Sequence, residues 1–247
     1  MQVTTIGLDI AKNVFQVHAI DAAETVVVRK QLRRSQVLEF FKALPACLVG
    51  MEACATAHYW ARELTKLGHQ VRLMPAKDVK AYVKRNKNDA ADAEAICEAV
   101  RRPTMRFVQV KSAEQQGRLM QHRTRDLLMR QRTQLINALR AHLAELGIVA
   151  AQGNAGLKEL LRSLRANGTR ASRPMLTPAS SYWPRGFMHT MIGSIDKRIV
   201  IEHRSNEASK RLRSIPGIGI VGASAIVATV PDPRRKTTKV KSFTSEF

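Results

Sequence analysis

The sequence predicts a mixed α/β domain at the beginning of the chain, followed by structure that is almost entirely helical. Two observations lead to this fold class. Five short apolar runs of β-forming residues lie between residues 3 and 74, and two amphipathic stretches of helical period separate the later runs. From residue 112 to about residue 147, leucines recur at helical spacing. The 247 residues are enough for one large domain or two modest ones.

The order of these elements predicts the type of sheet. Residues 3–10, 14–20 and 24–30 are three consecutive strand patterns, which we expect to form an antiparallel meander. A helix, a strand, a helix and a strand follow at residues 35–44, 46–52, 57–68 and 69–74. A meander followed by alternating helices and strands is the order of the ribonuclease-H-like fold. A doubly wound nucleotide-binding fold would alternate helix and strand from its start.

Helical patterns dominate the chain after Pro75. A short basic helix is predicted at residues 76–85 and a second helix at 89–102, whereas residues 105–111 predict either a strand or an extended connector. The long pattern from residue 112 carries a stripe of leucines at 128, 135, 139, 143 and 146, with arginines around it. Two interpretations stay open for this pattern. It is a solvated helix packed on one side, or a coiled-coil-like arm that pairs subunits or lies along nucleic acid.

The last third of the chain changes character twice. Residues 163–190 have no apolar period and contain three prolines, after which a helical pattern returns. We therefore predict four segments: an α/β domain, a long helical arm, an irregular linker and a C-terminal all-α region. Their predicted boundaries are residues 1–111, 112–162, 163–190 and 191–247.

Basic residues outnumber acidic residues by 41 to 20, which gives a formal net charge of +21 and a sequence pI near 10.8. The excess is +3 over residues 1–75, +8 over 76–142 and +10 over 143–247. Such a surplus predicts a polyanionic partner, most often nucleic acid, at the later two segments. Membrane binding would also explain positive charge, but no apolar run reaches about 18 residues. Three cysteines without metal spacing predict a reducing, cytoplasmic location.

Four carboxylates form the candidate catalytic site. Asp9 and Glu52 each end a predicted strand, and these two strands are neighbours in a ribonuclease-H-like sheet. Asp89 and Asp92 lie three residues apart at the start of a predicted helix, on one helical face. Each residue alone is explained as a turn residue or a helix cap. Together they predict a site for Mg²⁺ or Mn²⁺, which prefer hard oxygen ligands and assist phosphodiester chemistry.

Two groups of residues are candidates for contact with nucleic acid. The first is the run Lys84, Arg85 and Lys87 directly before the two aspartates. The second is a helix-hairpin-helix pattern in "SIPGIGIVGASAI", where glycines let backbone amides approach a phosphate. Its candidate contacts are Gly217, Gly219, Lys210, Arg211 and Arg213. A plain turn between two helices is the alternative for this pattern.

Three stretches closely resemble the DEDD transposases of bacterial insertion sequences, specifically the insertion-sequence 110 family. They are "IGLDIAKNVFQVHAID", the run from "GMEACATAHYW" to "FVQVKS", and "SIPGIGIVGASAIVATVPDP". The resemblance implies a RuvC-like N-terminal domain with Asp9, Glu52, Asp89 and Asp92 as metal ligands, and self-association through the helical arm. It also implies a C-terminal domain that supplies a nucleophilic serine, a structured guide RNA that pairs with DNA, and a bacterial protein associated with the nucleoid.

The chain departs from the family pattern in two places. After Pro233 it continues as "RRKTTKVKSFTSEF", and residues 163–190 lack the expected Ala- and Leu-rich helix. Our hypothesis is a frame-damaged, truncated transposase, because neither Ser242 nor Ser245 lies in the context expected of the nucleophile. The predicted function is DNA strand cleavage and transfer by a transposase or site-specific recombinase. The alternatives are a catalytically inactive nucleic-acid-binding fragment and a RuvC-like junction nuclease.

Overall fold

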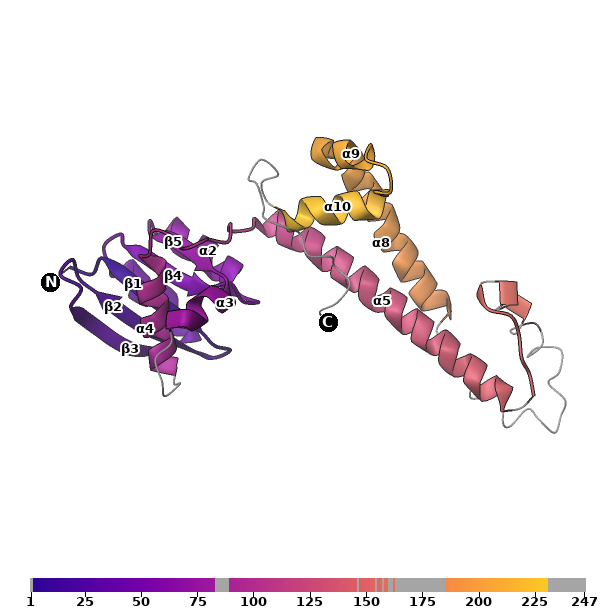
Figure 1. The fold of residues 1–247 in the computed structure, drawn as a ribbon, viewed down its shortest axis with the longest axis horizontal. Helices are drawn as coiled ribbons and strands as arrows, with labels where there is room; N and C mark the ends of the chain where they lie inside the picture. The colour runs from indigo at the N-terminus through magenta and orange to yellow at the C-terminus, as the bar shows by residue number, and fades with distance from the viewer. Residues whose placement is uncertain are drawn as a thin grey trace. The chain divides into compact units, whose positions relative to one another are not determined.

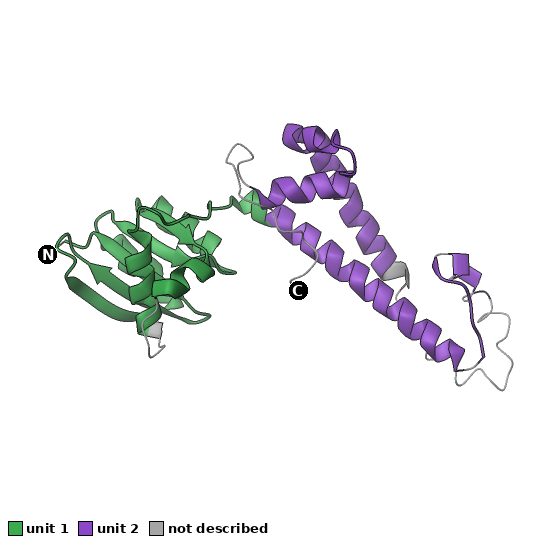
Figure 2. Cartoon of the chain, in the orientation of Figure 1, with its two compact units in different colours: residues 1–116 green, residues 117–247 purple. Residues whose placement is uncertain are grey.

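The computed structural model describes residues 2–82, 89–145, 147–153, 155–156, 158–159, 162 and 185–230. The chain divides into two compact units, residues 1–116 and 117–247 (Figure 2). Lys84, Arg85, Lys87, Ser242 and Ser245 lie outside the described residues.

The first unit contains a five-stranded mixed sheet (Figure 1). Its strands are β1 (Thr5–Ile10), β2 (Val14–Ile20), β3 (Val26–Arg33), β4 (Leu48–Glu52) and β5 (Gln70–Met74). The strand order is β3-β2-β1-β4-β5; β2 runs antiparallel to β1 and β3, and β4 runs parallel to β1 and β5. The α/β class and the three-strand meander are therefore confirmed, and this arrangement is consistent with a ribonuclease-H-like fold.

One face of the sheet holds the main apolar core. Alternate residues of β1 and β4, such as Ile6, Leu8 and Met51, are fully buried on it, because side chains along a strand alternate between faces. The helices α1 (Val37–Lys42) and α2 (Ala57–Lys66) belong to the same cluster through residues that include Phe41 and Leu64. A 3₁₀ turn, η1 (Arg34–Gln36), comes before α1, where the sequence predicted a helix that starts at a Ser N-cap.

The opposite face carries α4 (Asp89–Val100), which lies directly on the backbone of β1 and β4. A Cβ atom at Gly7 would overlap the carbonyl oxygen of Ala93 and lie 2.5 Å from the Cys97 nitrogen. A Cβ atom at Gly50 would lie 2.7 Å from Cβ of Val100. Since only hydrogen fits at these two positions, the glycines determine how closely the helix approaches the sheet.

Two short elements and an extended connector complete the first unit. The helix α3 (Ala76–Val79) and the 3₁₀ turn η2 (Lys80–Tyr82) follow β5. Residues 105–111 form the extended connector, because Val108 makes only an isolated antiparallel bridge to Leu73. The end of the connector is held by α2. Arg62 donates to the carbonyl of Lys111 at 2.7 Å, and Nδ1 of His58 accepts from the Lys111 amide at 3.1 Å.

The second unit is helical in its described part. The long helix α5 (Ala113–Ala144) begins at the end of the first unit and continues through the second. Three further helices are α8 (Arg185–Ser205), α9 (Glu207–Arg213) and α10 (Ile220–Thr229). α8 begins inside the stretch predicted to be irregular, because no proline follows Pro184 until the turn after α9. Of the predicted leucine stripe, Leu128, Leu139 and Leu143 are buried.

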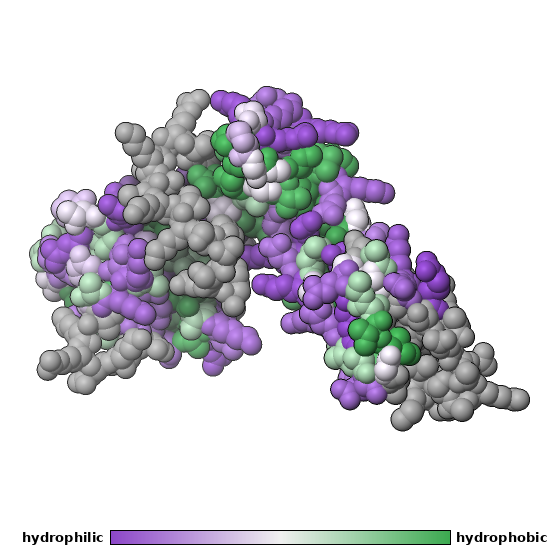
Figure 3. Space-filling view, turned by 45° about the vertical axis from the view of Figure 1, so that its right-hand side comes forward, coloured by the Kyte–Doolittle hydropathy of each residue, from purple (hydrophilic) through white to green (hydrophobic). Residues whose placement is uncertain are grey.

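The surfaces of the helical unit differ in polarity (Figure 3). Apolar residues gather over α10. Ile226 within this helix is 38% exposed, and Ile215 in the turn before it is 49% exposed. Among the helices of the described residues, none is long and apolar enough to cross a membrane.

Candidate functional site

Asp9 and Glu52 lie next to each other at one end of the sheet, where the strands β1 and β4 end. The parallel register pairs Gly7 with Gly50 and Leu8 with Met51, so the next residues of the two strands are Asp9 and Glu52. Neighbouring strands lie about 5 Å apart. Because side chains alternate, both carboxylates belong to the face of Gly7 and Gly50, which is the face that α4 covers. Both residues also make polar interactions in the structure.

The helix α4 starts at this same end of the sheet. It runs against β1 in the opposite direction, because Ala93 contacts Gly7 and the thiol of Cys97 lies 4.0 Å from the carbonyl of Thr5. Its first residue, Asp89, therefore belongs to the end of the sheet where β1 ends. Asp92 is partly exposed in the first turn, while the side chain of Asp89 lies outside the described part of the chain.

The four carboxylates are thus contributed by β1, β4 and the first turn of α4. In the parts of the chain that the structure describes, no three His, Cys, Asp or Glu side chains form a group that could hold a metal ion. The donor set of carboxylate oxygens is nevertheless the type that Mg²⁺ and Mn²⁺ prefer.

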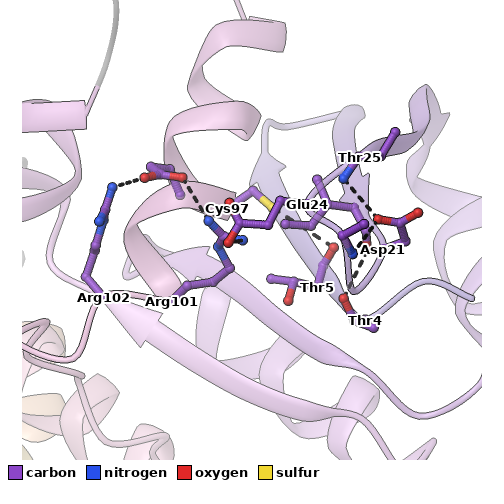
Figure 4. A network of polar contacts seen from close by, with 11 residues as sticks. Thr4, Thr5, Asp21, Glu24, Thr25, Cys97, Arg101 and Arg102 are labelled. Carbon is purple, nitrogen blue, oxygen red and sulfur yellow. Dashed lines mark hydrogen bonds and ion pairs between the residues drawn. The ribbon is translucent and has the colours of Figure 1, made fainter.

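The other end of α4 is anchored by a polar network at the opposite edge of the sheet (Figure 4). Arg101 makes ion pairs with Glu24 at 2.8 Å and with Glu98 at 3.2 Å. The Arg101 guanidinium lowers the pKa of the exposed Glu24 carboxyl. Beneath them, burial raises the pKa of the Cys97 thiol to about 11, so this cysteine is protonated and structural. The network thus anchors the C-terminal end of α4, whereas Asp89 and Asp92 lie at its N-terminal end.

The predicted nucleic-acid contacts of the second unit lie on the surface. Lys210, Arg211 and Arg213 are exposed on α9, and Lys210 forms an ion pair with Glu207 at 2.7 Å. Gly217 has a φ of 85°, in the left-handed region that favours glycine, and it lies in the exposed turn between α9 and α10. Gly219 is the N-cap residue of α10.

Two features of the structure do not follow from the sequence. The first is that Arg29, Lys30 and Arg33 are exposed along β3, at the edge of the sheet. The run "VRKQLRR" gave the signal, but an edge position cannot be read from it. The second is a set of buried hydrogen bonds between helices, of which the pair His122 and Ser224 joins α5 to α10 at 3.1 Å. No local pattern indicates a contact across 102 residues of sequence.

A comparison with known families identifies the family to which the chain belongs. A family model described as a transposase, of the DEDD type of IS110 elements, matches residues 6–148, which is more than half of the chain. The chain belongs to this transposase family. The match includes β1, β4 and α4, and with them all four candidate carboxylates of the transposase.

Individual relatives are similar over almost the whole chain. This chain is 46% identical over 247 residues to a probable family 20 transposase of Pseudomonas aeruginosa, and the match covers 95% of this chain and 70% of the relative. It is 43% identical to a putative transposase of Sinorhizobium fredii, covering 94% of this chain and 60% of the relative. The transposase for element IS1328 of Yersinia enterocolitica is 37% identical, with coverages of 93% and 69%. The chain thus spans 60% to 70% of the length of these curated relatives.

Proposed function

We propose that this chain acts in DNA transposition and that Asp9, Glu52, Asp89 and Asp92 direct cleavage of a DNA strand. The observation that carries the proposal is the register of β1 and β4, in which Asp9 and Glu52 occupy adjacent positions on the face covered by α4. The first turn of α4 adds Asp92 at the same end of the sheet. Membership of the transposase family supports this choice of substrate.

The four carboxylates would hold Mg²⁺ or Mn²⁺. Such a metal, when bound, supplies an activated oxygen nucleophile and stabilises the leaving oxygen of a phosphodiester. The contribution of the chain is rigid positioning. Asp9 and Glu52 follow buried strand residues, and α4 is seated on Gly7 and Gly50, so little side-chain movement is needed to orient the carboxylates.

Three further proposals concern partners. The α9–α10 hairpin would contact DNA backbone through Lys210, Arg211, Arg213 and the exposed amides near Gly217 and Gly219, as a helix-hairpin-helix does. A structured guide RNA and self-association through α5 are proposed on the family resemblance alone. Sedimentation of the purified chain, with and without a truncation of α5, tests self-association.

Cleavage of branched DNA tests the main proposal. We expect the purified chain to nick a labelled four-way junction only when Mg²⁺ or Mn²⁺ is present. The variant Asp9→Asn should lower the rate at least about 100-fold, because one of the four proposed metal ligands is lost. Asp126→Asn, on an exposed position of α5, removes the same charge and is the matched control. Cleavage that survives Asp9→Asn would show that the carboxylates do not direct it.

The second candidate function is nucleic-acid binding without cleavage. It is favoured by the net charge of +21 and by three exposed cations on one short helix, α9. Binding that persists in Asp9→Asn while no metal-dependent nick appears in the parent chain would support this function. A RuvC-like junction nuclease is separated from a recombinase by the products, since only the recombinase rejoins strands.

A further inference from the structure

The strand β3 carries basic residues toward the end of the sheet at which Asp9 and Glu52 lie. Residues 25–38 contain Arg29, Lys30, Arg33 and Arg34 and no acidic residue. β3 lies at one edge of the sheet, and the side chains of Arg29, Gln31 and Arg33 are exposed. A basic strip along an exposed edge strand is therefore a feature of residues 1–75, whose total charge excess is only +3.

Strand register places this strip on the same face as the carboxylates. Asp9 pairs with Gln16, and Gln16 pairs with Gln31, so the three residues form one row across β1, β2 and β3. Arg29 and Arg33 share the face of Gln31 because alternate residues of a strand point the same way. The ion pair of Arg29 with Glu94 of α4, at 3.3 Å, independently shows that this is the α4 face.

Distances along the sheet suit a polymer backbone. Gln31 is two strands away from Asp9, or about 10 Å. Arg33 is further along β3 toward the edge at which β1 and β4 end, since Val14, the first residue of β2, pairs with it. From Arg29 to Arg33 the strip extends roughly 13 Å at strand spacing.

The turn between β1 and β2 adds Lys12 at the same edge, and Arg34 holds this turn in place. The Arg34 amide donates to the carbonyl of Asn13 at 2.9 Å, and its guanidinium donates to the carbonyl of Lys12 at 3.3 Å. The guanidinium also lies over the ring of Trp60, 5.1 Å from its centroid. Arg34 is thus a positioning residue, which fixes the backbone that presents the exposed Lys12.

We propose that Lys12, Arg29, Gln31 and Arg33, which we call the β3 basic edge, bind the phosphodiester backbone of the DNA strand that enters the carboxylate site. The inference rests on the proposed function, because it takes the strand to be cut at Asp9 and Glu52. A strip one side chain wide fits a single backbone, and cations this near to a cluster of carboxylates offset the repulsion between that cluster and phosphate.

Binding without divalent metal tests the β3 basic edge separately from cleavage. The test variant is Lys12→Gln with Arg33→Gln, and the probe is a fluorescent single-stranded DNA of 30 nucleotides. The control is Lys42→Gln with Lys66→Gln, which removes two exposed charges at the ends of α1 and α2, where the chain approaches the opposite edge of the sheet. Thermal melts of both variants establish that they are folded.

The two double variants should differ clearly. We expect the test variant to bind about tenfold more weakly and to lower the slope of log affinity against log salt by roughly 1.4, since each contact to a single strand contributes about 0.7. The control should change affinity less than about twofold, as expected for charges outside the contact. Equal losses in both variants would overturn the proposal, because only net charge would then matter.

A photo-crosslink tests the position directly. Gln31→p-benzoylphenylalanine should crosslink to DNA, and the same substitution at the exposed Gln70, at the far end of the sheet, should not. In an equal mixture of DNA and RNA of one sequence, crosslinks mainly to RNA would overturn the assignment to DNA. If the crosslink forms and no nick is seen in Mg²⁺, the proposed cleavage fails while the β3 basic edge stands.

Discussion

Different kinds of contact stabilise the inside of each of the two units. In the first unit, fully buried apolar residues fill one face of the sheet, and α4 contacts strand backbone directly at Gly7 and Gly50. In the second unit, polar side chains also join the helices, beside buried apolar residues such as Leu143 and Ile199. Arg125 of α5 pairs with Asp196 of α8 at 2.6 Å, and His203 of α8 contacts Ser209 of α9 at 2.7 Å. The stability of the first unit should therefore be sensitive to changes in side-chain volume. The stability of the second unit should be sensitive to the loss of single hydrogen-bond or ion-pair partners.

This difference also bears on the site. The hydrogen-bonded register of β1 and β4 by itself places Asp9 and Glu52 at neighbouring positions on one face of the sheet. Helices joined by buried hydrogen bonds lose stability when one partner is removed, because the polar group that remains is buried and unpaired. Substitutions in each unit, and a change of pH, test this contrast.

Gly7→Ala should lower the free energy of unfolding of the first unit by about 3 kcal/mol or more, because the new methyl group meets backbone atoms that cannot move aside. Gly117→Ala in α5 is the matched control, since nothing lies within 4 Å of its Cβ position, and it should be neutral or stabilising. Urea unfolding of both variants gives the comparison. Equal midpoints would mean that α4 does not seat on the sheet as described.

Ser224→Ala should lower the free energy of unfolding of the second unit by about 1–3 kcal/mol, because it leaves the buried His122 without its partner. Ser205→Ala, at an exposed serine at the end of α8, should have little effect. A double-mutant cycle with His122→Ala isolates the pair. Additive effects in the cycle would argue that the two side chains do not interact.

Acid should destabilise the first unit through His58. Burial, with help from Lys111 and Arg62, lowers the pKa of this imidazole to about 4. The unfolded chain then binds a proton that the folded chain resists, so stability is present above about pH 6.5 and is lost as pH falls toward 4. Between pH 7 and pH 5 the loss should be on the order of 1 kcal/mol, given the partial exposure of the ring. A parent and a His58→Asn variant that lose stability equally would contradict this assignment.

Glu24→Gln should have the smallest effect of this set. The ion pair of Glu24 with Arg101 is largely exposed on the Glu24 side and is screened by salt. We expect the unfolding midpoint to be unchanged within error in 0.5 M salt. A large shift would mean that the network at the far end of α4 contributes more to stability than its exposure suggests.

Much of the first unit was predictable from sequence, because its signals are local. Apolar alternation marked β1 and β2, and the carboxylates Asp9 and Glu52 stood at the ends of strands whose adjacency follows from the order of elements. The third strand was shifted: it was expected at residues 24–30 and is observed at Val26–Arg33. Because β3 is an edge strand with several exposed polar residues, its apolar pattern is weak and its end is poorly marked.

The element types, the neighbouring strands and the candidate carboxylates were therefore predictable from sequence, since side-chain periodicity and the order of elements are local properties of the chain. Two relations became evident only in the folded chain: α4 packs on Gly7 and Gly50, and Arg33 shares a face with Asp9. The contact between His122 and Ser224 is a third. These relations depend on register and on packing between residues far apart in sequence, for which the chain carries no local signal.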